Sequence, residues 1–255
     1  MPETAKVCYK LTLAYDGRNY FGWQRLSNKA TIQGELEDAI ASVVKAPIVV
    51  QGAGRTDRGA HAEGQVASFT LNNQWEEGPL MDALNETLPP TIRVLDCEEV
   101  PTTFHARMSA VGKEYAYLIW NRPELDESMD GRVWYVPERL SFGAMEEAVR
   151  HVVGRHDFAS FGTKPKHGQT STEREIYSAE LDLEDDVMTF RFQGNSFLNH
   201  MVRNMVRTIV RVGEGKFPPN ELIRILEAKN RQAAPGSAPA SGLYLMEVFY
   251  GDETE

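Results

Sequence analysis

Apolar residues recur at every second position in several segments of this chain, and stretches with helical spacing separate those segments. The alternation in residues 7–15 places on one side Val7, Tyr9, Leu11, Leu13 and Tyr15. Such alternation is typical of half-buried strands. We expect strands at residues 7–15, 48–51, 65–71, 92–97, 113–120, 173–183, 187–193 and 243–250. Because they do not alternate one by one with helices, the pattern favours an α+β fold of mainly antiparallel sheets with helices on one face.

Helical spacing predicts five helices, and their order suggests two similar halves. We expect helices at residues 32–45, 79–88, 141–153, 196–213 and 219–229. The succession of elements repeats loosely on either side of residues 106–112. A chain of 255 residues is long enough to bury two separate cores. We therefore expect two α+β domains, residues 1–108 and 109–255.

The cysteines and the hydropathy exclude several classes of protein. Cys8 and Cys97 are the only cysteines, and neither lies in a CxxC or a Cys/His cluster with metal-ligand spacing. A disulfide framework and a structural zinc site are therefore not expected. No stretch approaches the roughly 18 apolar residues of a membrane span, and the first residues do not resemble a signal peptide. We expect a cytoplasmic protein without membrane association.

The charge is unevenly distributed along the chain. The formal net charge is −10, which argues against a uniformly basic surface for nucleic acid. Residues 191–216, however, contain five basic side chains and one acidic side chain, Glu214. A polyanionic partner would therefore have to bind a local basic patch.

The segment GAGRTDRGAHAEG, residues 52–64, has the composition of a functional loop. Its four glycines allow the backbone to approach a ligand closely. Asp57 can act as a nucleophile or a general base, and Arg55 and Arg58 can meet phosphate groups. An ordinary surface turn has a similar composition, so the loop alone does not decide between the two interpretations.

Two other kinds of chemistry could use the acids of this loop. Asp57, His61 and Glu63 could be imagined as metal ligands, but no HExxH or DxD pattern accompanies them. Asp57 and Glu63 could be the carboxylate pair of a glycosidase, although nothing in the sequence determines their separation. We expect no metal.

The predicted helix at residues 196–213 carries a stripe of polar and basic residues. At steps of four along the chain come Asn199, Arg203, Arg207 and Arg211. Charged residues at this spacing commonly form a solvated helix face. No acidic residue lies between these arginines to form an i,i+4 ion pair, so the stripe favours an anionic partner.

Aromatic residues lie beside basic residues at several positions. Examples are Phe104 and Arg107 in FHAR, and Tyr115 and Tyr117 after Lys113 in KEYAY. Such rings can stack on nucleobases, or they can simply pack in a core. Tyr115 and Tyr117 occupy the same face of a predicted strand, so the pattern does not distinguish them.

Seven motifs in order resemble the TruA-type tRNA pseudouridine synthases, and together they span nearly the whole chain. They are YDGRNYFGWQ, GAGRTDRGAHA, FHAR, KEYAY, GRHDFASF, FLNHMVRNMV and SGLYLMEVFY. The resemblance implies a pseudouridine synthase fold with a cleft between its two halves. It also implies isomerisation of uridine to pseudouridine at tRNA positions 38, 39 and 40 in the anticodon stem and loop. The implied enzyme is a homodimer that uses neither a cofactor nor a metal.

The resemblance assigns roles to individual residues. Asp57, in the N-terminal half, matches the catalytic aspartate of the family. Tyr115 matches its active-site tyrosine, and Arg203 matches the arginine that pairs with the aspartate; both lie in the C-terminal half. The residues expected to bind RNA are Arg55, Arg58, His61, Arg107, Arg207 and Arg211.

Two residues depart from the family pattern. Arg58 follows the aspartate where the family usually has a small residue, and Arg207 occupies a position where glycine is common. Both add positive charge and bear on which tRNAs are preferred. The alternatives from other classes are a non-catalytic RNA-binding module and a hydrolase of the nucleoside bond.

Overall fold

The protein folds into two compact units, which we describe separately. The computed structural model describes residues 6–163 and 171–251. One unit comprises Met1–Val111 and Leu245–Glu255, and the other comprises Gly112–Tyr244. The first boundary falls near the expected one, whereas the last strand groups with the first unit rather than the second. That strand lies beside a strand of the first unit, and such long-range pairing leaves no mark on local sequence.

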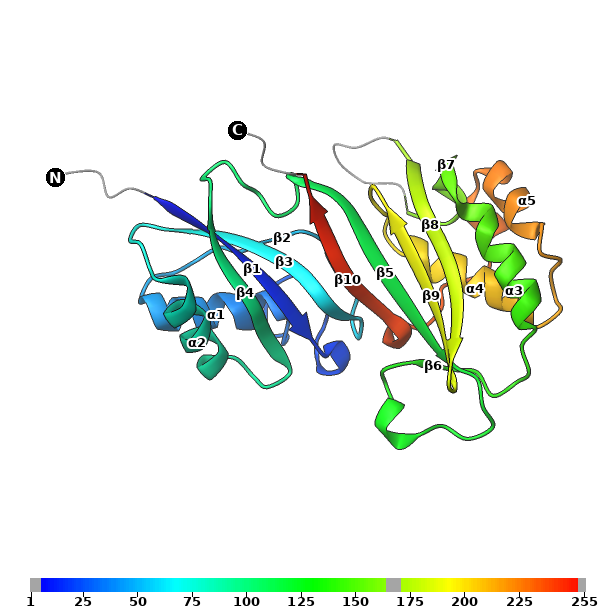
Figure 1. Ribbon diagram of the computed structural model, residues 1–255, viewed down its shortest axis with the longest axis horizontal. Coiled ribbons are helices and arrows are strands. Elements are labelled where there is room, and N and C mark those ends of the chain that lie inside the picture. The colour runs from blue at the N-terminus through cyan, green and yellow to red at the C-terminus, as the bar shows by residue number, and fades with distance from the viewer. Residues whose placement is uncertain (1–5, 164–170, 252–255) are drawn as a thin grey trace. The chain divides into compact units, whose positions relative to one another are not determined.

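The first unit is built on antiparallel strands (Figure 1). Its neighbouring strands are, in order, β4 (Ile92–Val100), β1 (Val7–Tyr15), β3 (His61–Leu71) and β10 (Leu243–Tyr250). The strand β1 runs antiparallel to both β3 and β4, and the short β2 (Gln51–Gly52) pairs with β3. Helices α1 (Ile32–Val44) and α2 (Glu77–Thr87) contact each other, and α2 also contacts β4. Along β1, the side chains of Tyr9, Leu11 and Leu13 are completely buried, as the alternation predicts.

The second unit has the same kind of construction. Its antiparallel strands are, in order, β5 (Ala110–Trp120), β9 (Val187–Gly194), β8 (Glu173–Glu184) and β7 (Gly154–Asp157). The short β6 (Trp134–Tyr135) pairs with β5 in parallel. The helices are α3 (Phe142–Val149), α4 (Met201–Gly213) and α5 (Glu221–Ala228), and α3 contacts both α4 and β8. The predicted α+β class with mainly antiparallel strands is therefore confirmed.

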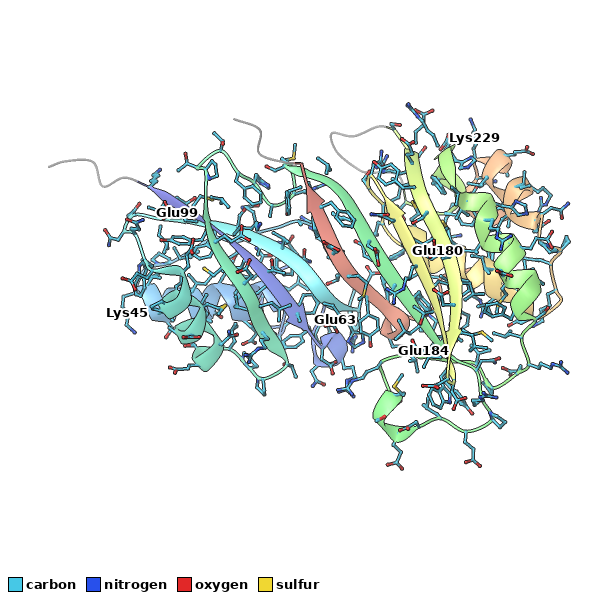
Figure 2. The ribbon with its side chains drawn as sticks, viewed as in Figure 1. Lys45, Glu63, Glu99, Glu180, Glu184 and Lys229 are labelled. Atoms are coloured by element: carbon cyan, nitrogen blue, oxygen red, sulfur yellow. The ribbon has the colours of Figure 1, made fainter. Side chains whose placement is uncertain are left out.

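The helix ends follow simple capping rules. The hydroxyl of Thr31, the N-cap of α1, accepts a hydrogen bond of 3.2 Å from the backbone N–H of Gly34. Lys45 ends α1 and Lys229 ends α5 (Figure 2). Their φ values are positive, 56° and 46°. A left-handed residue at this place turns the chain out of the helix. On the strands, exposed acids such as Glu180 of β8 alternate with buried apolar residues (Figure 2).

Several elements differ from their predictions, and the strands β6 and β7 were not predicted. The strand β3 begins at His61, so part of the predicted loop is strand, and β2 is shorter and lies later than predicted. Helix α4 begins at Met201 rather than at residue 196, because His200 adopts a left-handed conformation with φ 63°. The side chain of Leu198 packs against Gly162, where a Cβ atom would lie 2.3 Å from the Leu198 Cβ. Tertiary packing therefore replaces the first predicted turn of this helix.

Candidate active site

The loop that carries Asp57 is fixed at both ends in the first unit. It leaves β2 at Gly52 and enters β3 at His61. The N–H of Ala53 donates to the carbonyl oxygen of Val66 at 2.8 Å, and the N–H of Ala60 donates to the carbonyl oxygen of Asp57 at 3.1 Å. Asp57 itself is half-buried. The loop is therefore a defined turn on a strand pair.

Two glycines of the YDGRNYFGWQ motif let another segment pack directly against the backbone of this loop. A Cβ atom on Gly17 would lie 1.9 Å from the carbonyl oxygen of Ala60. A Cβ atom on Gly22, whose φ is 89°, would lie 2.7 Å from the carbonyl oxygen of Thr56 and 3.1 Å from the carbonyl carbon of Asp57. Only glycine allows this approach. The YDGRNYFGWQ motif thus supports the GAGRTDRGAHA loop. The sequence alone did not indicate this structural role.

Buried polar side chains complete the support of the loop. The hydroxyls of Tyr15 and Thr56 form a hydrogen bond of 2.8 Å. The amide nitrogen of Gln65 donates to the Tyr15 hydroxyl at 3.3 Å and to the Gly54 carbonyl at 3.0 Å. Burial raises the pKa of Tyr15 to about 12, although the hydrogen bonds with Thr56 and Gln65 act in the opposite direction. The phenol therefore stays neutral at physiological pH and serves as a structural hydrogen-bonding group.

His61 occupies a different position from the one expected of an RNA contact. Its side chain is only 2% exposed, and its Nδ1 accepts a hydrogen bond of 3.2 Å from the N–H of Gly17. Asp16 Oδ1 lies 3.5 Å from the same Nδ1. In the structure, the buried His61 side chain therefore supports the Asp16–Gly17 turn, and little of its surface remains for a contact with RNA.

The predicted arginines of the first unit are all exposed, namely Arg55, Arg58 and Arg107. The guanidinium carbon of Arg58 lies 4.3 Å from the ring centroid of Phe21, and Lys29 Nζ lies 4.5 Å from the same centroid. Two cations and an aromatic ring therefore lie beside the Asp57 loop. Cation–π contacts of this kind orient a charged group without neutralising it.

In the second unit, the structure distinguishes the two tyrosines that the pattern could not. Tyr117 is completely buried, and its hydroxyl donates to the carbonyl oxygen of Pro239 at 2.7 Å. Burial raises the pKa of Tyr117, and the charges of Arg203 and Arg207 only partly oppose this rise. Tyr115 is half-buried, and its ring packs edge-on against Phe197 with the centroids 4.9 Å apart. Tyr115 is therefore the tyrosine that retains exposed surface.

Arg203 lies in the first turn of α4 and is tied to a segment far along the chain. Its Nε donates to the carbonyl oxygen of Ala238 at 2.7 Å, and the N–H of Ala238 donates to the carbonyl oxygen of Arg203 at 3.1 Å. The buried neighbour Asn204 accepts hydrogen bonds at Oδ1 from Arg231 and Ser237. The stretch of residues 231–242 is thus bound to the start of α4 and orients the Arg203 guanidinium.

The predicted arginine stripe consists of three arginines in three different environments. Asn199 does not share their face, because it precedes the helix and forms a bridge with Thr163. The guanidinium carbon of Arg207 lies 5.2 Å from the Trp134 ring centroid. Arg211 forms an ion pair of 3.0 Å with Glu214. This acid lies three residues after Arg211, so it is not among the residues between the arginines, where the sequence showed no acid. Charge pairing therefore explains part of the stripe, and a single role for all three arginines is not supported.

The described part of the chain was also searched for metal sites and for membrane-spanning helices. Within residues 6–163 and 171–251, no three or more His, Cys, Asp or Glu residues come together as ligands for a metal ion would. In the same residues, no helix is both long enough and apolar enough to cross a membrane.

Comparison with known proteins places these motifs in a family. The sequence model described as tRNA pseudouridine synthase matches residues 12–108 and 148–251. The chain belongs to the tRNA pseudouridine synthase family. Relatives named tRNA pseudouridine synthase A are 42% identical in Methylacidiphilum infernorum, over 98% of each chain, and 40% identical in Acetivibrio thermocellus, over 94% of this chain and 98% of the relative.

Solved structures add no further argument to this family assignment. The chain is similar to a chain of a Cbf5-Nop10-Gar1 complex at 11% identity and a TM-score of 0.37, covering 94% of this chain and 59% of that one. A likeness this distant carries no weight beside the sequence relatives. The family assignment therefore rests on the sequence matches, which include the Asp57 loop and the start of α4.

Proposed function

We propose that this isomerase of tRNA converts uridine to pseudouridine at positions 38, 39 and 40 of the anticodon stem and loop, with Asp57 as the nucleophile. The observation that carries the proposal is the GRTD loop, whose backbone is fixed by Gly17 and Gly22 while Asp57 remains half-buried. A nucleophile must be held in a reactive orientation, and a turn packed between rigid segments supplies this.

The proposed reaction is an isomerisation and needs no external oxidant or reductant. The Asp57 carboxylate attacks the nucleoside, and the bond between the uracil nitrogen and C1′ of the ribose breaks. The uracil turns within the pocket, and its C5 forms a bond to C1′. The C5 proton is then lost, a proton is taken up at the uracil nitrogen released from C1′, and the carboxylate is released. One proton is lost and one is gained, so the product has the composition and the mass of uridine.

Tyr115 and Arg203 complete the proposed catalytic set from the second unit. Tyr115 keeps an exposed ring surface that can stack on the flipped base, and it can assist the loss of the C5 proton. Arg203 pairs with Asp57 in this proposal. Its Nε donates to Ala238, so the two terminal nitrogens are the groups assigned to the carboxylate. The active enzyme therefore needs both units.

Binding of tRNA is assigned to exposed arginines and to a second copy of the chain. Arg55, Arg58 and Arg107 are exposed and are proposed to meet phosphates of the RNA. We further propose a cytoplasmic homodimer in which the tRNA touches both protomers. Sedimentation of the chain with and without tRNA tests this state, and a monomer in both samples would contradict it.

The central test is the replacement of Asp57. Asp57→Ala is expected to abolish pseudouridine formation while the Kd for tRNA stays within a few-fold, because phosphate contacts supply most of the affinity. The matched control is Glu63→Ala, which removes an exposed acid near the same loop and should keep the wild-type rate. Pseudouridine is mapped in a tRNA transcript before and after incubation. Turnover near the wild-type rate in Asp57→Ala would refute the assignment.

The same assay separates the alternative functions. A hydrolase of the nucleoside bond would release free uracil, whereas an RNA-binding module would leave the tRNA unchanged. Addition of EDTA should not alter the rate under conditions in which the tRNA stays folded. A rate lost in EDTA and restored by a divalent ion would indicate a metal requirement.

A further inference from the structure

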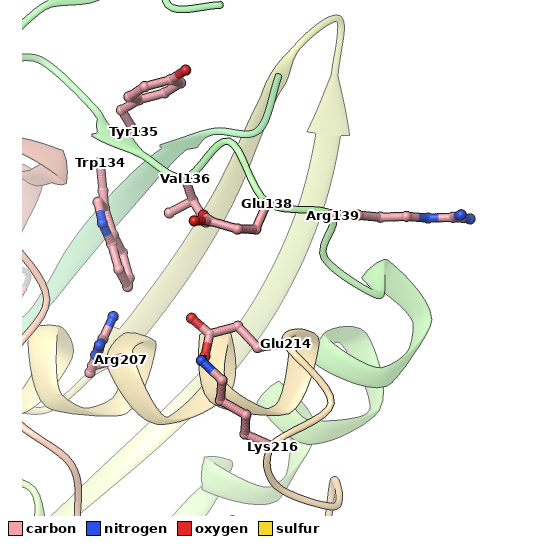
Figure 3. Close-up of a pocket in the computed structure, with 8 residues that line it drawn as sticks. All are labelled: Trp134, Tyr135, Val136, Glu138, Arg139, Arg207, Glu214 and Lys216. Carbon is pink, nitrogen blue, oxygen red and sulfur yellow. The ribbon is translucent and has the colours of Figure 1, made fainter. Parts of the chain in front are cut away.

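A pocket in the second unit lies between β6 and the C-terminal half of α4 (Figure 3). Its volume is about 400 Å³, toward the lower end of the range for small-ligand sites. Trp134 and Arg207 line one side, and Glu214 and Lys216 line the other. None of these four residues is part of the proposed catalytic set. The pocket therefore calls for an explanation of its own.

Arg207 lies over the Trp134 ring, and the two side chains share one wall of the pocket. The Arg207 guanidinium carbon lies 5.2 Å from the Trp134 ring centroid. On another side, the Trp134 ring packs edge-on against the buried Tyr117 ring, with the centroids 6.2 Å apart and an interplanar angle of 88°. The indole is thus held in place while it remains half-buried. Aromatic rings and guanidinium planes are the surfaces on which proteins stack unpaired bases.

The opposite wall presents a cation held by a carboxylate. Glu214 lies 2.8 Å from Lys216 Nζ and 3.0 Å from Arg211 Nη1. Partial burial alone would raise the pKa of Glu214. The hydrogen bond and charge of Lys216 and the charges of Arg211 and Arg207 lower this pKa. Glu214 is therefore ionised at neutral pH and holds Lys216 at the rim. The Lys216 side chain remains 53% exposed, so a phosphate group can reach it.

One further polar group faces this space. The Glu138 carboxylate extends into the pocket in Figure 3, whereas the Arg139 side chain points away from it. A carboxylate accepts hydrogen bonds and can receive an N–H of a base edge. With Arg139 pointing away, two cations and two carboxylates face the pocket, and they can meet a ligand with one phosphate and a base that donates hydrogen bonds.

We propose that this pocket binds one unpaired nucleotide of the tRNA other than the target uridine. The base stacks on the wall formed by Trp134 and Arg207, and its phosphate meets Lys216. This inference rests on the proposed function and deepens it. It also changes the role of Arg207 from a phosphate contact to part of a stacking surface.

The test separates stacking from phosphate contacts by their salt dependence. Trp134→Ala is expected to raise the Kd for an unmodified tRNA transcript roughly 5- to 100-fold, with no change in the slope of log Kd against log salt concentration. Trp134→Phe keeps a ring and should stay within about threefold of wild type. Lys216→Ala should reduce the slope by somewhat less than one unit, because one phosphate contact is lost.

Controls make every outcome decisive. Tyr177→Ala removes a ring that is 50% exposed on β8 outside the pocket, and it should bind tRNA as wild type does. Trp134→Phe guards against a folding defect in Trp134→Ala, because it preserves the contact with Tyr117. Wild-type affinity in Trp134→Ala, or equal losses in Trp134→Ala and Trp134→Phe, would overturn the pocket assignment. A wild-type chain that forms no pseudouridine would instead overturn the proposed function, whatever these variants bind.

Discussion

The Asp57 loop and the start of α4 are held in place by different kinds of contact. The loop is supported by backbone packed directly on backbone at Gly17 and Gly22. The start of α4 is supported by side-chain hydrogen bonds: Arg203 donates to Ala238, and Asn204 accepts from Arg231 and Ser237. Direct backbone packing leaves no space for an added atom, whereas a hydrogen bond can be lost without a steric clash. Substitutions in the Asp57 loop should therefore act through steric clashes, whereas substitutions at the start of α4 should act through lost hydrogen bonds.

The largest effect that tests this contrast is expected at Arg203. Arg203→Met should be almost inactive in single-turnover assays, and Arg203→Lys impaired but measurable, since an ammonium cannot replace the planar fork. The tRNA affinity should change only modestly in both variants. Ser237→Ala is the matched control, because it weakens the same support through Asn204 and leaves Arg203 in place. If Arg203→Lys kept full activity but lost RNA affinity, Arg203 would be a phosphate contact.

A large effect is also expected at Gly17, for a steric reason. Gly17→Ala would place a Cβ atom 1.9 Å from the Ala60 carbonyl oxygen, so the Asp57 turn must shift. We expect about 1–3 kcal/mol of lost stability and a rate reduced by at least about 100-fold. Gly78→Ala in α2 meets no atom within 4 Å and should be neutral or slightly stabilising. Urea unfolding and single-turnover rates measure both variants; an active Gly17→Ala would show that the loop tolerates displacement.

A moderate effect is expected when the hydroxyl beneath the loop is removed. Tyr15→Phe breaks the hydrogen bond to Thr56 and should cost about 1–3 kcal/mol of stability together with part of the catalytic rate. Tyr250→Phe is the matched control in the same unit, since its hydroxyl donates to Ala106 rather than to the loop. It should lose similar stability with the rate unchanged. Equal losses of rate in both variants would mean that the Tyr15 bond does not act through Asp57.

The smallest effect concerns pH and the turn beside His61. Partial burial would raise the pKa of Asp16, but hydrogen bonds from Arg18 and the charges of His61 and Arg18 hold it at about 2. Because the unfolded value is about 3.9, this carboxylate stabilises the fold above that pH, and the contribution disappears as the pH falls toward 2. Asp16→Asn should therefore show a flatter loss of stability between about pH 4 and pH 2 in urea unfolding. If the wild type and Asp16→Asn lost stability with the same slope between these pH values, Asp16 would not contribute to the loss of stability in acid.

Local pattern determined much of this protein. Alternation predicted β1 and β10 with their observed ends, and helical spacing predicted the start of α1 at residue 32. The motifs were sufficient to indicate the family, which the comparisons confirm. These features depend on neighbours in the chain or on residue identity alone. They can therefore be recognised before any tertiary contact is known.

Tertiary structure decided the features that depend on distant parts of the chain. Helix α4 loses its first predicted turn because Leu198 packs on Gly162, and His61 is buried because Gly17 approaches it. The support of Arg203 by Ala238 joins residues that local periodicity treats independently. In each case, packing and a distant hydrogen bond outweigh a local preference of at most about 1 kcal/mol per residue. Sequence therefore indicated the proposed reacting groups, whereas the fold determined what holds them.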